Sequence, residues 1–163
     1  MKIAFTGHRP QHFGGNFDHV QMRLNSFAAE VIAELRKQYG PETVMITGMA
    51  LGWDQAIANV CSQNEFPYIA AVPFQGQESV WQERSKTHYN FLLADAKEVV
   101  YVCPPGYAAW KMQKRNEWMV DQCDLLVALW DGKPGGTGNC VAYAKKVGKN
   151  LLNVWPYWTE HKP

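Results

Sequence analysis

Three glycine-containing segments of the chain carry residue types that bind anions: Thr6–Pro10, Thr47–Asp54 and Trp130–Gly138. A glycine lets the backbone turn sharply and approach a ligand closely. The second and third segments lead into stretches of helical periodicity, and a helix N-terminus offers free N–H groups and a positive dipole end to an anion. Two such loops together favour a phosphate site over simple tight turns. The glycines expected to shape it are Gly7, Gly48, Gly52, Gly135, Gly136 and Gly138.

Polar side chains in these segments add specific chemistry. Arg9 carries a planar guanidinium that pairs with phosphate or carboxylate, although a surface ion pair uses the same residue type. His8 suits a hydrogen bond to ribose, acid–base work or a structural loop contact. Asp54 starts a helical stretch, where a carboxylate serves either as a helix cap or as a contact to ribose or base.

Further candidates contribute rings, amides or backbone. Trp53 and Trp130 follow strand-like runs and suit stacking on a base, although core packing is the commoner fate of a tryptophan. Asn139 stands where the third segment meets the next helix, as a cap or as a ligand contact. The remaining residues of the predicted ligand-binding set are Ala50, Arg115, Asn116 and Thr137, with Arg115 expected to neutralise phosphate together with Arg9.

Other classes of site lack their signatures in this sequence. No Walker A Gly-Lys-Ser/Thr, no G-x-G-x-x-G fingerprint and no G-x-S-x-G elbow is present. The four cysteines form no C-x-x-C pair, so we expect reduced core thiols. His8 and His12 are four residues apart, but Pro10 between them breaks any helix, so we predict no metal site. We expect no cofactor.

The elements that must position these residues alternate along the chain. Strands are predicted at Ile3–Phe5, Thr43–Thr47, Tyr68–Val72, Glu98–Val102, Leu125–Trp130 and Leu151–Trp155. Between them, helical periodicity covers Val20–Leu35, Asp54–Gln63, Ser79–Asp95, Ala109–Gln122 and Asn139–Val147. This alternation is typical of a doubly wound sheet, and continuous apolar strands indicate that helices cover both of its faces.

We therefore predict an α/β fold: one Rossmann-like domain over residues 1–163, with a mostly parallel sheet flanked by helices. Ligands of such sheets bind outside the carboxyl ends of the strands, where the glycine-containing segments fall. The tail Pro156–Pro163 contains Tyr157 and Trp158, and three roles stay open for it: a flap, a subunit contact or packing on its own core.

Composition narrows the class of protein. The chain has 163 residues, 47% of them hydrophobic, which is enough for one globular domain. No apolar run approaches the roughly 18 residues of a membrane helix, so we predict a soluble, cytoplasmic protein. The formal net charge of +1 argues against broad electrostatic capture of nucleic acid.

Together the motifs Thr6–Pro10, Gly48–Asp54, Arg115–Met119 and Gly135–Gly138 resemble the SLOG superfamily, in particular its YpsA-like branch. That superfamily includes the LOG phosphoribohydrolases and the DprA single-strand DNA-binding proteins. The resemblance spans nearly the whole chain. It implies a Rossmann-like fold, a nucleotide or nucleotide-derived ligand over the strand ends, and a homodimer or higher homo-oligomer.

The LOG enzymes cleave the N-glycosidic bond of a nucleoside 5′-monophosphate, and this chain departs from their pattern. Arg115 and Met119 match the LOG R-x-x-x-M element, and the glycine loop matches in part. Asn139 replaces the threonine of that loop, and the glutamate positions fall on Val141 and Ala142. Neither residue can supply acid–base catalysis or charge stabilisation.

These observations predict a protein that binds or senses a nucleotide or a nucleotide derivative. The alternative is a nucleotide N-glycoside hydrolase, in which Arg115 and Asp54 are the catalytic candidates. In that case Glu117 or Asp131 is a further source of the missing carboxylate. DprA-like binding of single-stranded DNA is the weakest of the three hypotheses, because it calls for a basic groove.

Overall fold

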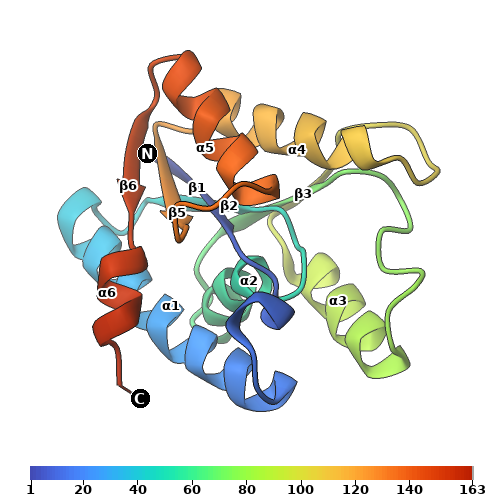
Figure 1. The fold of residues 1–163 in the computed structure, drawn as a ribbon, viewed down its shortest axis with the longest axis horizontal. Helices are drawn as coiled ribbons and strands as arrows, with labels where there is room; N and C mark the ends of the chain where they lie inside the picture. Colours follow the sequence, from blue (N-terminus) through green and yellow to red (C-terminus); the bar gives the residue numbers. More distant parts are fainter. Residues whose placement is uncertain (163) are drawn as a thin grey trace.

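A six-stranded, entirely parallel sheet forms the centre of the computed structural model, which describes residues 1–162 (Figure 1). The strand order across the sheet is β4-β3-β2-β1-β5-β6. The strands are β1 (Lys2–Gly7), β2 (Val44–Thr47), β3 (Tyr68–Val72), β4 (Glu98–Tyr101), β5 (Leu125–Leu129) and β6 (Asn150–Asn153). This order confirms the predicted doubly wound, Rossmann-like class.

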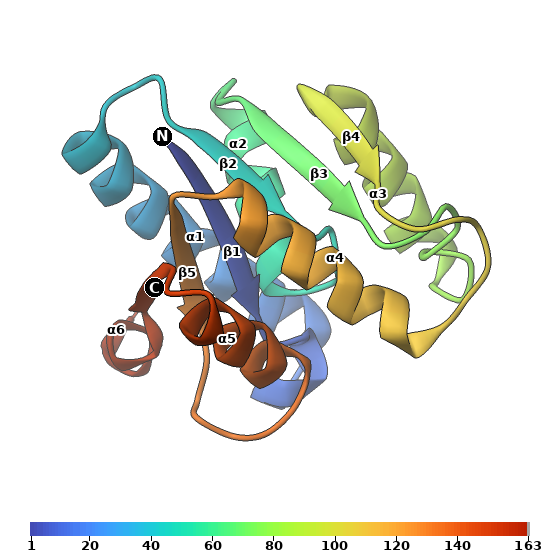
Figure 2. The ribbon, with the colours of Figure 1, turned by 90° about the horizontal axis from the view of Figure 1, so that it is seen from above.

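Helices cover both faces of the sheet, which gives three layers (Figure 2). One face carries α1 (Phe17–Tyr39), α2 (Trp53–Gln63) and α3 (Glu83–Asp95); the other carries α4 (Ala109–Gln122) and α5 (Gly136–Lys146). A short 3-10 helix, η1 (Pro10–Phe13), follows β1, and α6 (Trp155–Glu160) follows β6. Separate apolar cores fill the two interfaces, one around Trp53 and Ile57 and the other around Met119 and Cys140.

Position in the sheet explains the sequence pattern of the strands. Every residue of β3 and β5 is buried, because helices cover both faces of these inner strands. The edge strands β4 and β6 have no fully buried residue. The predicted apolar runs therefore correspond most closely to the centre of the sheet.

Six of the ten helix boundaries differ from the predicted ones by one to four residues, and two of these differences change the loops before the third and fifth helices. The third helix begins at Glu83 rather than Ser79, because turns closed by Ser79 N–H to Gly76 O and by Trp81 N–H to Glu78 O precede it. The fifth begins at Gly136 rather than Asn139, since part of the glycine loop forms its first turn. The glycine-rich segment is thus shorter than the sequence suggests.

The C-terminal segment packs on the core of its own chain. Trp158, on α6, is 4% exposed, and its ring centre lies 5.2 Å from that of Phe13 and 5.5 Å from that of Phe27. The Arg23 guanidinium covers the same ring at 3.8 Å. Of the three roles left open for the tail, core packing is the one that α6 adopts. Within residues 1–162, no helix combines the length and the apolar character needed to cross a membrane.

Candidate functional site

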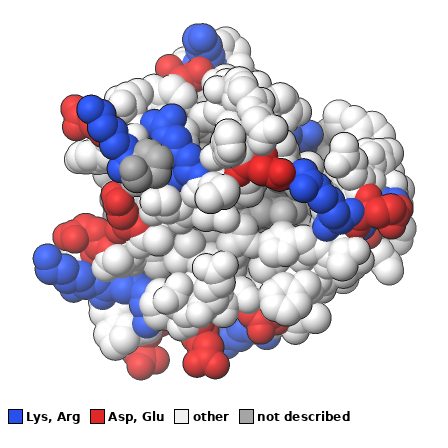
Figure 3. Space-filling model, turned by 90° about the horizontal axis from the view of Figure 1, so that it is seen from below, with Lys and Arg blue, Asp and Glu red and all other residues white. Residues whose placement is uncertain are grey.

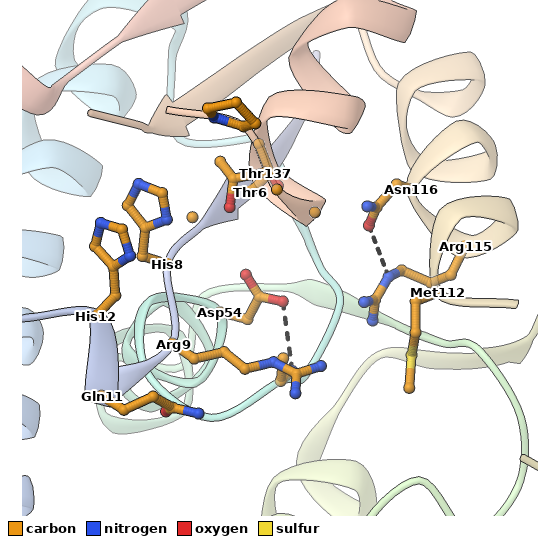
Figure 4. Close-up of a pocket in the computed structure, with 15 residues that line it drawn as sticks. Thr6, His8, Arg9, Gln11, His12, Asp54, Met112, Arg115, Asn116 and Thr137 are labelled. Carbon is orange, nitrogen blue, oxygen red and sulfur yellow. Dashed lines mark hydrogen bonds between the residues drawn. The ribbon is translucent and has the colours of Figure 1, made fainter. Parts of the chain in front are cut away.

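A pocket of about 430 Å³ opens at the carboxyl ends of β1 and β5 (Figure 4). This is the point where the strand order reverses, because the chain leaves β1 towards β2 on one side while β5 pairs with β1 on the other. Loops after β1, β2 and β5 and the first half of α4 line it. Doubly wound sheets bind ligands at such switch points.

The pocket brings together many of the predicted site residues. Those that line it are Gly7, His8, Arg9, Ala50, Asp54, Arg115, Asn116, Gly135, Gly136 and Thr137. The lining residues that were not predicted are Thr6, Gln11, His12, Met112 and Pro134. Met112 precedes Arg115 by one helical turn, so the helical period gives a signal for it. Gln11 and His12 belong to η1, which no sequence pattern indicated.

The other predicted residues lie outside the lining: Gly48, Gly52, Trp53, Trp130, Gly138 and Asn139. Trp53 is fully buried, with its ring centre 5.6 Å from that of Phe27, so it belongs to the core rather than to a base-stacking surface. Trp130 donates its indole N–H to Lys133 O at 2.8 Å and closes the β5–α5 loop. Asn139 is exposed on α5.

Two of these glycines, Gly48 and Gly52, lie behind residues that line the pocket. A Cβ atom at Gly48 would lie 2.5 Å from Arg115 Nη1 and 2.9 Å from Asp54 Oδ2, so only glycine lets both side chains approach. Gly52 has φ of 94°, and its Cβ would meet His8 O at 2.9 Å. These positions therefore set the distance between the wall elements, whereas nothing within 4 Å would meet a Cβ at Gly136.

Arg115 and Asp54 form the buried end of the pocket. Arg115 is 4% exposed; its Nε donates to Asn116 Oδ1 at 2.9 Å, and its Nη1 donates to Gly48 O. Asp54 is 6% exposed; its Oδ2 accepts from Ala50 N–H at 3.4 Å, and its Oδ1 has no hydrogen-bond partner within residues 1–162. Burial raises the pKa of Asp54 to about 6, although Arg115 opposes the shift.

The open part of the pocket adds positive potential. Arg9 is exposed and lines the pocket from the β1–η1 loop. Gly136 and Thr137 line it with the first turn of α5, where no side chain of the described residues caps the helix. Two guanidinium groups and a helix N-terminus thus face one carboxyl group of raised pKa. The arrangement favours an anionic ligand.

At the rim, His8 and His12 lie side by side (Figure 4). Their rings stack with centres 3.6 Å apart, and both Nε2 atoms face the carboxylate of Asp131, at 3.2 Å from His8 and 2.7 Å from His12. Burial and the neighbouring His12 lower the pKa of His8. No α-helix joins the two histidines; Pro10 begins the 3-10 turn that carries His12 back to His8, so their rings stack.

A parallel α/β sheet with its pocket at the switch point defines the doubly wound class. Within that class, the chain belongs to the YspA SLOG family, whose sequence profile (YpsA) matches residues 3–153. This confirms the family resemblance of the motifs. The SPbeta prophage-derived protein YoqJ of Bacillus subtilis (strain 168) is 37% identical over 129 residues, which cover 68% of this chain and 75% of YoqJ.

Solved structures share the fold at low sequence identity. DprA of Streptococcus pneumoniae superposes with a TM-score of 0.64 at 17% identity, over 93% of this chain and 49% of DprA. DprA of Helicobacter pylori, described for its single-stranded DNA binding mode, gives 0.62 at 18% identity, over 94% of this chain and 64% of that protein. This chain thus spans 49% and 64% of these two proteins, and the likeness shows the fold alone.

Proposed function

We propose that this protein binds a nucleotide or a nucleotide derivative at the switch-point pocket, with the phosphate between Arg9, Arg115 and the first turn of α5. The observation that carries the proposal is the buried Arg115 guanidinium, which forms no salt bridge within residues 1–162 and interacts with the Asp54 carboxyl group, whose pKa burial raises. A buried guanidinium beside an open pocket is stabilised by an anion that enters it. Membership of the SLOG family supports the same ligand class.

Asp54 gives this proposal its second contact. Its Oδ1 is buried and has no partner within residues 1–162, and an unsatisfied buried acceptor costs about 1–3 kcal/mol. A ribose hydroxyl or a base N–H that donates to Oδ1 would remove this cost. The pocket, at about 430 Å³, lies in the range of small-molecule sites. Phosphate at the arginines and sugar at Asp54 would place a mononucleotide across it.

Calorimetric titration with AMP, ADP-ribose, cyclic ADP-ribose and NAD tests the proposal. Arg9→Met and Arg115→Lys should each weaken the best ligand about 10- to 100-fold, because a charge-assisted hydrogen bond contributes about 1.5–3 kcal/mol. Arg84→Met is the matched control, since Arg84 forms an exposed ion pair with Asp18 on another surface. The proposal would be contradicted if none of the four nucleotides bound, or if Arg84→Met lost as much affinity as Arg9→Met and Arg115→Lys.

One observation favours hydrolysis as a second candidate function. Val141 is 1% exposed on the core side of α5, so the LOG glutamate has no counterpart there. Asp54, with its pKa of about 6, is a buried carboxyl group in the same pocket that can hold or release a proton near neutral pH. Chromatography of the titration mixtures would detect free base. Release that Asp54→Asn abolishes would support N-glycoside hydrolysis, with Asp54 and Arg115 as its catalytic residues.

The formal net charge of +1 does not favour DNA as the ligand. Lysines and arginines alternate with acidic residues on the face seen in Figure 3, without a continuous basic stripe. We therefore propose a small nucleotide as the ligand.

The proposal also includes a cytoplasmic location and a homodimer or higher homo-oligomer. Light scattering after size-exclusion chromatography tests the oligomeric state, and a monomeric mass would contradict the proposed homo-oligomer.

A further inference from the structure

Arg115 and Asn116 are neighbours on α4 and form a hydrogen-bonded pair in the wall of the pocket (Figure 4). The Asn116 side chain is buried, at 8% exposed. Arg115 Nε can only donate, so the amide atom that faces it at 2.9 Å must be the oxygen, Asn116 Oδ1. This contact fixes the orientation of the amide and leaves its Nδ2 available to another partner.

The Nδ2 group of Asn116 is a donor that still lacks a partner. Within residues 1–162, no group accepts a hydrogen bond from it. The unpartnered side-chain atoms that are shut off from solvent in the same part of the chain are Trp53 Nε1, Asp54 Oδ1 and His161 Nε2. Asn116 Nδ2 is not one of them, and Asn116 lines the pocket. A group that enters the pocket can therefore accept from Nδ2.

Arg115 leaves a second donor in the same region. Its Nε donates to Asn116 Oδ1 and its Nη1 donates to Gly48 O, whereas Nη2 has no acceptor within residues 1–162. Arg115 Nη2 and Asn116 Nδ2 are each two covalent bonds from an atom of the hydrogen bond that joins the side chains. Both unused donors thus belong to one small part of the wall.

The pocket wall separates donors from acceptors. The donor part consists of Arg115 and Asn116, with Arg9 and the first turn of α5 also lining the pocket. The carboxyl group among the lining residues is that of Asp54, and its Oδ1 is a buried acceptor without a partner. A phosphate oxygen can only accept, so it matches the donor part. A hydroxyl or amino group can donate, so it matches Asp54.

We propose that Asn116 is a specificity-determining residue of the pocket: its Nδ2, oriented by Arg115, donates to a phosphate oxygen of the ligand beside Arg115 Nη2. The inference rests on the proposed function and names the part of the wall that selects phosphate over uncharged ligand groups. Asn116→Asp should invert this selection. The new carboxylate keeps an acceptor for Arg115 Nε, but it removes the donor and places negative charge beside the phosphate.

NMR spectra of the side-chain amides of the full-length, ¹⁵N-labelled protein test the contact. The probes are inorganic phosphate, AMP and adenosine, and the Asn116 signals are the pair that Asn116→Asp lacks. Phosphate and AMP should each move this pair in a saturable way, whereas adenosine at the same concentration should leave it in place. The amide signals of Asn90, which is exposed on α3, are the control and should not move with any probe.

Calorimetry with AMP measures the effect on affinity. Asn116→Asp should weaken AMP binding at least about tenfold, because it replaces a hydrogen bond with repulsion between like charges. Asn116→Ala removes the donor without adding charge and should weaken it by about three- to tenfold. Asn90→Asp is the matched control, because it makes the same change of charge on another surface and should leave the affinity unchanged. Thermal denaturation verifies that the variants fold.

Any of three results would overturn the inference: Asn116 signals that stay in place with both phosphate and AMP, equal movement of these signals by adenosine, or AMP binding by both Asn116 variants that is as tight as that of the native protein. The amide would then serve only to hold the Arg115 guanidinium. The nucleotide titrations of the native protein judge the proposed function separately. Nucleotide binding together with any of these results would reject the role of Asn116 alone.

Discussion

The two ends of one pocket are built in opposite ways. At the buried end, the charged groups of α2 and α4, Asp54 and Arg115, are 6% and 4% exposed, and Gly48 lies directly behind both. At the rim, loops after β1 and β5 supply His8, His12 and Asp131, and the side chain of His12 is 33% exposed. The buried charges depend on protein contacts, whereas at the rim water reaches His12, although the side chains of His8 and Asp131 are only 10% and 8% exposed.

Because the two ends of the pocket differ in burial, the same kind of substitution should have different effects at each end. Desolvation makes each polar contact at the buried end costly to lose, so changes there should affect folding and binding together. The contact of His12 with Asp131 at the rim is partly screened by solvent, so its loss should have little effect on stability. Three stability measurements test whether the two ends of the pocket differ in this way.

The largest expected effect is the pH dependence contributed by Asp54. Its pKa is about 6 in the folded protein and 3.8 ordinarily, so the folded state binds more protons between these values and its free energy of unfolding falls as the pH rises. Asp54→Asn removes this dependence. Denaturant titrations measure the free energy of unfolding of both proteins. Between about pH 4 and about pH 7, the difference between Asp54→Asn and the native protein should change by about 3 kcal/mol in favour of the variant.

A matched control is Asp95→Asn, at an exposed position on α3. The difference in free energy of unfolding between Asp95→Asn and the native protein should stay nearly constant over the same pH range. An Asp54→Asn difference that is equally constant would mean that the Asp54 carboxylate is well solvated, and the contrast between the two ends would fail.

A smaller effect is expected from Gly48→Ala. The added Cβ would lie 2.5 Å from Arg115 Nη1 and 2.8 Å from Arg115 Cζ, so the buried guanidinium must move. Overpacking of this kind costs about 1–3 kcal/mol, which urea denaturation would measure. Gly136→Ala is the control, because no atom within 4 Å would meet its Cβ. Equal stability of the two variants would show that the wall behind Arg115 yields freely.

The smallest effect is expected from His12→Ala. The variant loses one partly exposed hydrogen bond to Asp131, for which we expect less than about 1 kcal/mol. Urea denaturation of His12→Ala and Gly48→Ala under the same conditions compares their losses in free energy of unfolding directly. A loss as large as that of Gly48→Ala would make the rim a structural element of the fold.

Local patterns predicted much of the fold. The predicted strand Tyr68–Val72 and the predicted helix Ala109–Gln122 agree with the structure in both bounds, because an apolar run and a 3.6-residue period are local properties. The start of α3 was predicted four residues early, since the turns before Glu83 depend on backbone hydrogen bonds that leave little trace in side-chain types.

The candidate site divides in the same way. Arg9, Asp54 and Gly136 were found because each stands just after a strand or at the start of a helix, and the carboxyl ends of parallel strands share one edge. The role of Trp53 was not decided by its position. The ring turned into the core against Gly7 and Phe5, a choice that depends on packing between β1 and α2.

Periodicity and glycine-rich turns are local properties, so the amino-acid pattern predicts the order of strands and helices, the family, and the edge of the sheet where the pocket opens. Which charges are buried and which groups converge depends on packing between segments that are far apart in the chain. His12 and Asp131 are separated by 119 positions, and they meet because β1 and β5 are neighbours in the sheet. Long-range strand pairing brings such residues together, and no local pattern records it.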